Sequence, residues 1–224
     1  MNALMQPLLL SLKLATVTTI ILFVLAIPLV YFIFFHSRRS KAIFKAVVSM
    51  PLVLPPTVLG YYLLIMLRPE GWLGQLSAAL FDTRLVFSFP GLVIGSLIFS
   101  LPFMVNPILS AIESLPASYR EAAYTLGKSR WNTLWHVLLP NVKASVIVGL
   151  VMTFAHTIGE FGVILMIGGN IPGETRVASI AIYNEVEMLN FANADLYASI
   201  LLIFSFIVLL AVYLYQNRRP RQVI

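Results

Sequence analysis

Cysteine is absent from the 224-residue chain, and charged residues are scarce at 11%. The absence of cysteine excludes disulfide bonds, thiol nucleophiles and cysteine-ligated metals. The scarcity of charge excludes an ordinary soluble domain, in which about a quarter of the residues are charged. A disordered chain is excluded as well, because 59% of the residues are hydrophobic and 12% are aromatic.

Long apolar runs take up most of the sequence, and the mean hydropathy of +0.91 indicates an integral membrane protein. A bilayer core about 30 Å thick is crossed by roughly 20 helical residues. Five segments fit this length, and we predict an all-α polytopic protein in which residues 1–224 form one transmembrane domain. The five predicted transmembrane helices cover residues 14–35, 46–67, 88–112, 144–168 and 196–216. The first is expected to stay as a helix, since no basic stretch precedes it as in a signal peptide.

Basic residues are distributed unevenly among the segments that connect the predicted spans. If the N-terminus is outside, the outer side receives only four of the 15 Lys and Arg residues, and eleven lie on the cytoplasmic side. The four outer ones are Lys13, Arg68, Arg84 and Arg176. The positive-inside rule therefore predicts an outer N-terminus and a cytoplasmic C-terminus. The net charge of +6 then describes a membrane face near anionic lipid, and no nucleic-acid partner is expected.

The predicted cytoplasmic loop over residues 113–143 is much longer than a turn between packed helices requires. Ser118, with Glu121 three residues later, predicts a capping box at the start of a short helix. Gly127 is expected to end that helix. A second helix is predicted over residues 129–139, where apolar residues recur every three or four positions: Trp131, Leu134, Trp135 and Leu138.

These loop residues resemble the motif of the membrane permease subunits of bacterial binding-protein-dependent ABC importers. In that family the motif is Glu-Ala-Ala, three residues, Gly, nine residues, Ile, one residue and Leu-Pro. Every spacing matches here, and the one departure is Val137 in the isoleucine position. The matching residues are Glu121, Ala122, Ala123, Gly127, Leu139 and Pro140. The resemblance implies a coupling helix that contacts a partner ATPase, with Arg120 and Glu121 at the rim of the contact.

Residues 49–61, and residues 158–162 followed by 169–176, are similar to the molybdate importer permeases, and less closely to their sulfate-importing relatives. The resemblance implies a multi-pass permease of the bacterial inner membrane that imports a tetrahedral oxyanion by alternating access. Molybdate is the first expectation, and sulfate, thiosulfate and tungstate stay open. The implied partners are a second permease copy in a homodimer, two cytoplasmic ABC ATPase subunits and an extracytoplasmic oxyanion-binding protein. No cofactor is expected in this chain, since ATP and magnesium would bind to the ATPase.

Candidate pathway or gate residues lie in the second and fourth spans and in an outer loop. Pro55 and Pro56 bend or break the second span, either as a structural kink or as part of a pathway. His156 and Glu160, four residues apart, share one helical face. They can hydrogen-bond between helices or line the pathway, but a metal site needs a third ligand. Arg176 is either a solvated loop charge or a contact for the anion or the binding protein.

Other function classes are less well supported by the residues. A membrane scaffold whose loop binds a cytoplasmic protein stays possible, as does an ion-driven secondary transporter, for which Glu160 is the one intramembrane carboxylate. No enzyme activity is expected, because no nucleophile-elbow spacing occurs. The segment 168–175 has the glycine spacing of a P-loop, but Glu174 stands in place of the phosphate-binding lysine.

Overall fold

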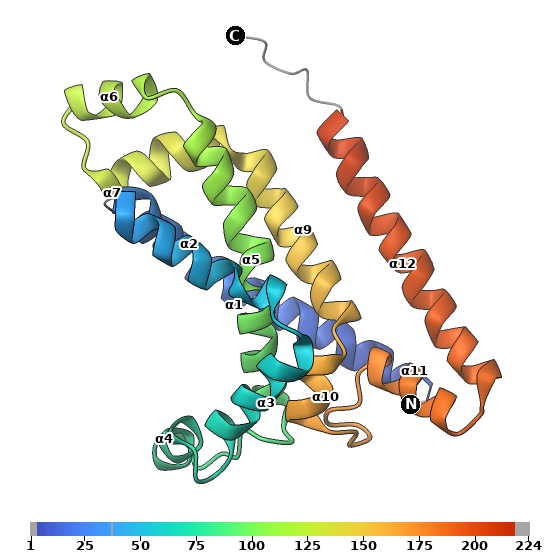
Figure 1. The fold of residues 1–224 in the computed structure, drawn as a ribbon. Helices are drawn as coiled ribbons and strands as arrows, with labels where there is room; N and C mark the ends of the chain where they lie inside the picture. Colours follow the sequence, from blue (N-terminus) through green and yellow to red (C-terminus); the bar gives the residue numbers. More distant parts are fainter. Residues whose placement is uncertain (1–3, 37, 218–224) are drawn as a thin grey trace.

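The computed structural model of this chain describes residues 4–36 and 38–217 (Figure 1). Every regular element within these residues is helical, which confirms the all-α prediction. Three of the basic residues counted on the cytoplasmic side, Arg218, Arg219 and Arg221, lie outside the described residues.

Thirteen helical elements follow one another along the described chain. They are α1 (Met5–Phe35), α2 (Arg38–Val53), α3 (Pro56–Leu67), α4 (Trp72–Phe81), α5 (Phe89–Ser114), α6 (Ser118–Thr125), α7 (Arg130–Thr133), the π-helix η1 (Leu134–Leu138), α8 (Leu139–Asn141), α9 (Lys143–Gly159), α10 (Gly162–Gly168), α11 (Ala178–Glu187) and α12 (Phe191–Asn217).

The helices α1, α5 and α12 are each long and apolar enough to cross a membrane. Two bent helix pairs have the composition of a broken span, so up to five crossings fit the described residues. The pair α2 and α3 is bent by 108°, and the helical stretch Arg130–Asn141 is bent by 81° relative to α9. The predicted span over 144–168 is divided, because α9 ends at Gly159 and α10 begins at Gly162.

The break between α2 and α3 follows directly from two prolines. A residue that precedes a proline avoids the α conformation, and a proline has no N–H for the helical ladder. Pro55 is accordingly extended, with ψ 134°, and Pro56 starts α3 at a position where the missing N–H is harmless. By contrast, Pro28, Pro51, Pro102 and Pro107 lie within helices.

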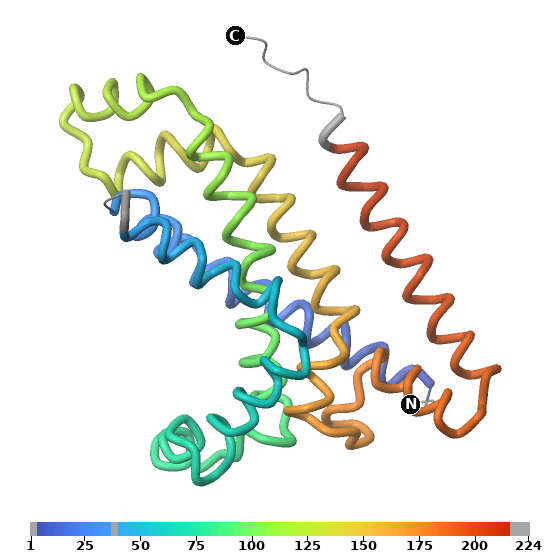
Figure 2. The backbone as a smooth tube through the Cα atoms, viewed as in Figure 1, coloured from blue at the N-terminus to red at the C-terminus, as the bar shows by residue number. Residues whose placement is uncertain are grey.

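Helices α1, α5 and α9 pack together as the centre of the bundle (Figure 2). One end of the bundle carries α6 and the C-terminal ends of α1, α5 and α12, whereas α4, α10 and α11 lie at the other end (Figure 1). Helix α12 stands apart from the centre and contacts α11 and α9. Which end faces the cytoplasm stays a prediction from the basic residues.

Helix α3, which follows the break after α2, and helix α10, which follows the break after α9, pack directly on each other. Helices α3 and α10 approach so closely that a Cβ atom at Gly162 would lie 2.8 Å from the Cβ atom of Pro56. A Cβ atom at Gly60 would lie 2.8 Å from the Cβ atom of Met166. Such spacing is shorter than van der Waals contact, so α3 and α10 can approach this closely because a glycine of each helix faces a larger residue of the other.

Candidate functional site

The short helix of the predicted coupling loop forms as α6, but its start differs from the prediction. Ala117 is the residue before the first turn, and no side chain caps the helix. The capping-box prediction for Ser118 and Glu121 is therefore wrong, since Ser118 is already the first helical residue. Glu121 still lies in the first turn, where its negative charge stabilises the helix through the helix dipole.

Gly127 ends α6 in the way that the sequence predicted. Its φ is +72°, in the left-handed region that glycine adopts without a Cβ penalty. The Gly127 N–H donates to the Tyr124 carbonyl, and the Lys128 N–H donates to the Ala123 carbonyl at 3.0 Å. These two bonds form a Schellman motif, which satisfies carbonyls at the end of the helix and turns the chain back.

The two faces of α6 have different surroundings. Ala123 is buried on the side that packs against α7 and η1, and the Arg120 guanidinium lies 5.3 Å from the centre of the Phe34 ring. Glu121 and Ala122 are exposed, and Leu126 is 78% exposed. The exposed surface of this helix and its C-cap therefore includes Glu121, Ala122 and Leu126, while Ala123 and Arg120 contact their own chain.

The second part of the loop is built into the core of the bundle. Ser129, the first residue of the predicted helix, caps α7 by accepting a hydrogen bond from the Asn132 N–H. Leu134, Leu138 and Leu139 are buried in a cluster that also contains residues of α1 and α5. Pro140 is exposed next to the 81° bend that leads into α9. The second half of the loop is therefore packed against the C-terminal halves of α1 and α5.

Two pairs of hydrogen-bonded side chains, four residues apart, join α5 to the C-terminal end of α9. Ser96 donates to the Glu160 carboxyl group at 2.8 Å, and Ser100 lies 3.0 Å from the Nδ1 atom of His156. Both helices present these residues at positions i and i+4, so one face of each helix meets the other. The prediction that His156 and Glu160 share a helical face and hydrogen-bond between helices agrees with these contacts.

The hydrogen bonds around Ser100 place a proton on the Nδ1 atom of His156. Thr157 donates its only hydroxyl proton to the Thr153 carbonyl, so Ser100 must donate its own proton to the Thr157 oxygen. The Ser100 oxygen can then only accept a proton, and it accepts one from the Nδ1–H of His156. The imidazole ring is also stacked on Phe103, with ring centres 4.1 Å apart.

A hollow of about 590 Å³ lies beside these two hydrogen-bonded pairs and is lined by residues on both sides of the α9–α10 break and by the start of α3. Pro56 and Thr57 line it from α3, and His156, Gly159 and Glu160 line it from the end of α9. Glu160 is 3% exposed, and its Oε1 atom has no hydrogen-bond partner among the described residues. The structure thus brings three of the five candidate pathway residues, Pro56, His156 and Glu160, together at one level, and Pro55 directly precedes Pro56 in the chain.

Arg176 lies in a different place. Its guanidinium donates to the side-chain and main-chain oxygens of Asn170, and it lines a separate pocket of about 280 Å³ together with Gln6 and Glu185. The neighbouring P-loop-like segment is closed on itself, because Thr175 donates to the Gly168 carbonyl and accepts from the Ile171 N–H. Arg176 therefore belongs to a folded loop and is only half-buried.

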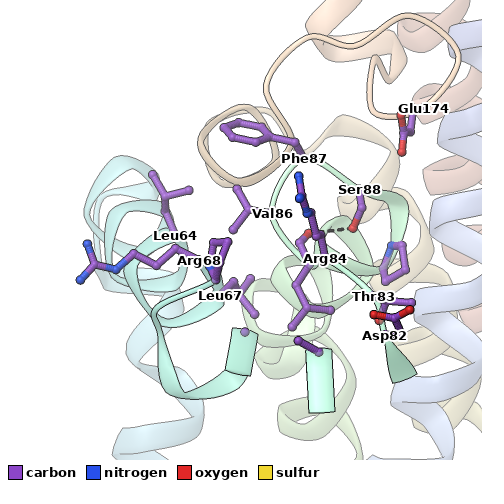
Figure 3. A pocket seen from close by; sticks show the side chains of 15 residues that line it. Leu64, Leu67, Arg68, Asp82, Thr83, Arg84, Val86, Phe87, Ser88 and Glu174 are labelled. Carbon is purple, nitrogen blue, oxygen red and sulfur yellow. Dashed lines mark hydrogen bonds between the residues drawn. The ribbon is translucent and has the colours of Figure 1, made fainter. Parts of the chain in front are cut away.

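A further cavity of about 810 Å³ lies between α3, α4 and the segment that leads into α5 (Figure 3). Arg68 and Arg84 line it, but so do Asp82 and Glu174, and the Arg68 guanidinium extends away from Arg84. The opposite charges balance, so this cavity does not gather cationic groups for an anion. In the part of the chain that the structure describes, no group of three His, Asp or Glu residues is placed to hold a metal ion.

Sequence reasoning missed the partners of the buried polar groups. Ser96 and Ser100 were not singled out, although their spacing of four matches that of His156 and Glu160 and could have indicated the pairing. Glu113 was also missed. It is one of two acidic residues in the predicted cytoplasmic loop, where basic residues dominate, and that imbalance was the available signal.

The long apolar helices of the described residues have the length and composition of a membrane-embedded protein. Residues 23–222 match the family described as the inner membrane component of binding-protein-dependent transport systems. The chain belongs to this family.

Individual relatives refine the comparison. The molybdenum transport system permease protein ModB of Azotobacter vinelandii is 44% identical over 210 residues, which cover 94% of this chain and 92% of the relative. The sulfate transport system permease protein CysT of Escherichia coli K12 is 30% identical over 185 residues, covering 83% of this chain and 66% of the relative.

The fold is shared with a solved importer. A bacterial alginate ABC transporter, crystallised with an alginate-bound periplasmic protein, has a chain that superposes with a TM-score of 0.72 at 21% identity. The similarity covers 100% of this chain and 80% of that one. At this identity the match shows the permease fold alone, and it agrees with the predicted multi-pass transport permease.

Proposed function

We propose that this chain is the permease subunit of an ATP-driven importer of a tetrahedral oxyanion, and that this oxyanion is molybdate. The observation that carries the proposal is the loop over residues 113–143: its motif spacing is complete, one face of its short helix is free, and its second half lies in the core. The similarity to a molybdenum permease over nearly the whole chain supports the choice of cargo.

The coupling step follows from the construction of the loop. The chain needs a source of mechanical work, and the free surface of α6 at Glu121, Ala122 and Leu126 fits a cleft on a cytoplasmic ATPase that holds ATP and magnesium. Small and exposed side chains permit close approach of such a partner. Because Leu134, Leu138 and Leu139 pack among residues of α1 and α5, displacement of α6 is transmitted to the bundle.

The pathway is proposed at the level of the two helix breaks. Discontinuous helices that meet at one level are the usual setting of a substrate pathway in membrane transporters. Pro55, Pro56, His156 and Glu160 lie in or next to the hollow at this level. With a single histidine and a single carboxyl group, the hollow holds a passing dianion weakly, which suits release to the cytoplasm.

Two copies of the chain, related by a two-fold axis, would enclose the pathway between them. An extracytoplasmic binding protein would deliver the anion to the side of the membrane that carries Arg176. Two ATPase subunits would bind the two α6 helices, and their closure on ATP would drive the change between inward-open and outward-open bundles. Sulfate and tungstate are the alternative cargoes, since both are tetrahedral dianions.

The decisive test is uptake by a reconstituted complex of this chain, its ATPase and its binding protein in proteoliposomes. We expect ATP-dependent accumulation of labelled molybdate, with competition by tungstate and little by sulfate. Accumulation of sulfate in preference to molybdate would overturn the choice of cargo. Uptake driven by an ion gradient without ATP, or no uptake of any oxyanion, would support a secondary transporter or a scaffold and overturn the proposal.

Arg176 has its own test in the same assay. We expect Arg176→Gln to raise severalfold the concentration of loaded binding protein that gives half-maximal uptake, with little change in the maximal rate. Unchanged kinetics would remove Arg176 from the proposed contact surface.

A further inference from the structure

A single carboxylate, Glu113, is held by two lysines of another helix. The Lys41 Nζ atom lies 2.6 Å from Oε1, and the Lys45 Nζ atom lies 2.6 Å from Oε2. The two lysines are four residues apart on α2 and therefore share one face of that helix. The Glu113 side chain is only 24% exposed, so the contact is more than a solvated surface pair.

This cluster lies where the coupling loop leaves the bundle. Glu113 is the penultimate residue of α5, and α6 begins five residues later at Ser118. The described residues contain one other ion pair, Arg68 with Glu70, which is 4.0 Å long and exposed. The shortest ion pairs among the described residues therefore lie at the end of α5, where the coupling loop begins.

The coupling helix itself is joined to the same place through an aromatic ring. The Lys41 ammonium lies 5.0 Å from the centre of the Phe34 ring, and the Arg120 guanidinium of α6 lies 5.3 Å from it. Cations at this distance are attracted to the ring. Phe34, on α1, thus contacts a residue of α6 and a residue of α2. We refer to Glu113, Lys41, Lys45, Phe34 and Arg120 as the Glu113 cluster.

Helix α2 leads from this cluster to the proposed pathway. Further along the helix, Asn106 of α5 donates to Ser49 of α2 at 3.1 Å, so α2 and α5 are fastened at a second point. Helix α2 then ends at Val53, and Thr57 lines the hollow at the start of α3. Helix α2 therefore runs from the Glu113 cluster to the break that directly precedes the α3 residues lining the hollow.

We infer that Glu113 is a positioning residue that makes α2 move with the coupling helix, and so transmits the state of the ATPase to the helix break beside the hollow. This inference rests on the proposed contact between α6 and an ATPase, but not on the identity of the cargo. If Glu113 loses its charge, two ammonium groups face each other without a counter-charge, and α2 is no longer held to the end of α5.

The test uses the absence of native cysteine. Thr57→Cys places one thiol at the exposed start of α3, and its rate of labelling by a maleimide is measured in the permease–ATPase complex with and without ATP and vanadate. With Glu113 intact we expect the nucleotide to change this rate at least about 5-fold. With Glu113→Gln we expect the ratio to approach one, although the complex still assembles and hydrolyses ATP.

A charge-reversed cluster separates positioning from simple stability. The combination Glu113→Lys, Lys41→Glu and Lys45→Glu restores two ion pairs with opposite polarity, and we expect it to restore the nucleotide-dependent change in labelling. Glu113→Lys alone should not restore the nucleotide-dependent change in labelling. The inference is overturned if Glu113→Gln keeps the full change, if the reversed cluster fails to restore it, or if the unmodified cluster shows no change.

The cargo is tested separately in the same preparation by uptake of labelled molybdate. If molybdate is not taken up but labelling depends on Glu113, the choice of cargo fails and the inference stands. If molybdate is taken up and labelling is independent of Glu113, the inference fails and the proposed function stands.

Discussion

Gly127 allows a sharp prediction, because its role can be separated from the space around it. A Cβ atom at this position would meet nothing within 4 Å, so a side chain does not clash within the chain. The backbone, however, is left-handed with φ +72°, and an ordinary L-residue in this conformation costs roughly 1–2 kcal/mol. Since 1.4 kcal/mol corresponds to a factor of ten, the correctly turned loop becomes about 5- to 30-fold less populated in Gly127→Ala.

The assay is the apparent affinity of the permease for the ATPase subunits, measured by titrating ATPase into permease proteoliposomes and recording ATP-driven uptake. We expect Gly127→Ala to weaken this apparent affinity by about 5- to 30-fold. The β-branched Gly127→Val should weaken it further. Asparagine tolerates the left-handed conformation, so Gly127→Asn should stay within a few-fold of the original chain. All variants should insert normally, because the site lies outside the predicted spans.

Two results would refute this reasoning. If Gly127→Asn is as harmful as Gly127→Val, the requirement is for a missing side chain at a partner surface and not for the backbone conformation. If Gly127→Val is harmless, the Schellman turn does not orient α6 for its partner.

Further predictions concern α6 and the helix contacts. We expect Glu121→Lys to abolish ATP-driven uptake while membrane insertion is unchanged, and normal uptake would count against an ATPase contact on the free face of α6. Gly162→Ala should lower the stability of the purified protein by about 1–3 kcal/mol through overpacking, whereas Gly159→Ala, with nothing near its Cβ, should change it little. Equal thermal shifts would contradict the close approach of α3 and α10. A double-mutant cycle of Ser96→Ala and Glu160→Met, which removes the acceptor, should give a coupling of roughly 0.6–1.7 kcal/mol in unfolding measurements, and additivity would exclude that hydrogen bond.

Much of the helical architecture could be read from the sequence, because the apolar runs are long and lipid leaves a spanning backbone few alternatives to a helix. The end of α6 was predictable for a local reason: Gly127 supplies a conformation that few other residues adopt. The start of α6 was not, since Ser118 is equally suited to cap a helix or to begin one. A cap depends on the path by which the chain arrives, and only three residues separate the end of α5 from the start of α6.

The candidate pathway was only partly predictable. The spacing of His156 and Glu160 indicated a shared face, but their partners Ser96 and Ser100 lie on a helix about 60 residues away in the chain, and such pairings depend on helix packing. The sequence also grouped Arg176 with the pathway, although the structure holds it in a separate loop. The meeting of the two helix breaks has no local signature in the sequence, and the excess of basic residues around Glu113 does not identify its lysine partners on another helix.

The central claim is that the loop over residues 113–143 faces a cytoplasmic ATPase, and cysteine labelling of α6 tests it most directly. Ala122→Cys places the only thiol of the chain on the free face of α6. A membrane-impermeant maleimide should label it in inside-out vesicles but not from the outer side of intact cells, and added ATPase subunits should protect it. Labelling from the outer side, or labelling from the inner side that the ATPase does not reduce, would contradict the account.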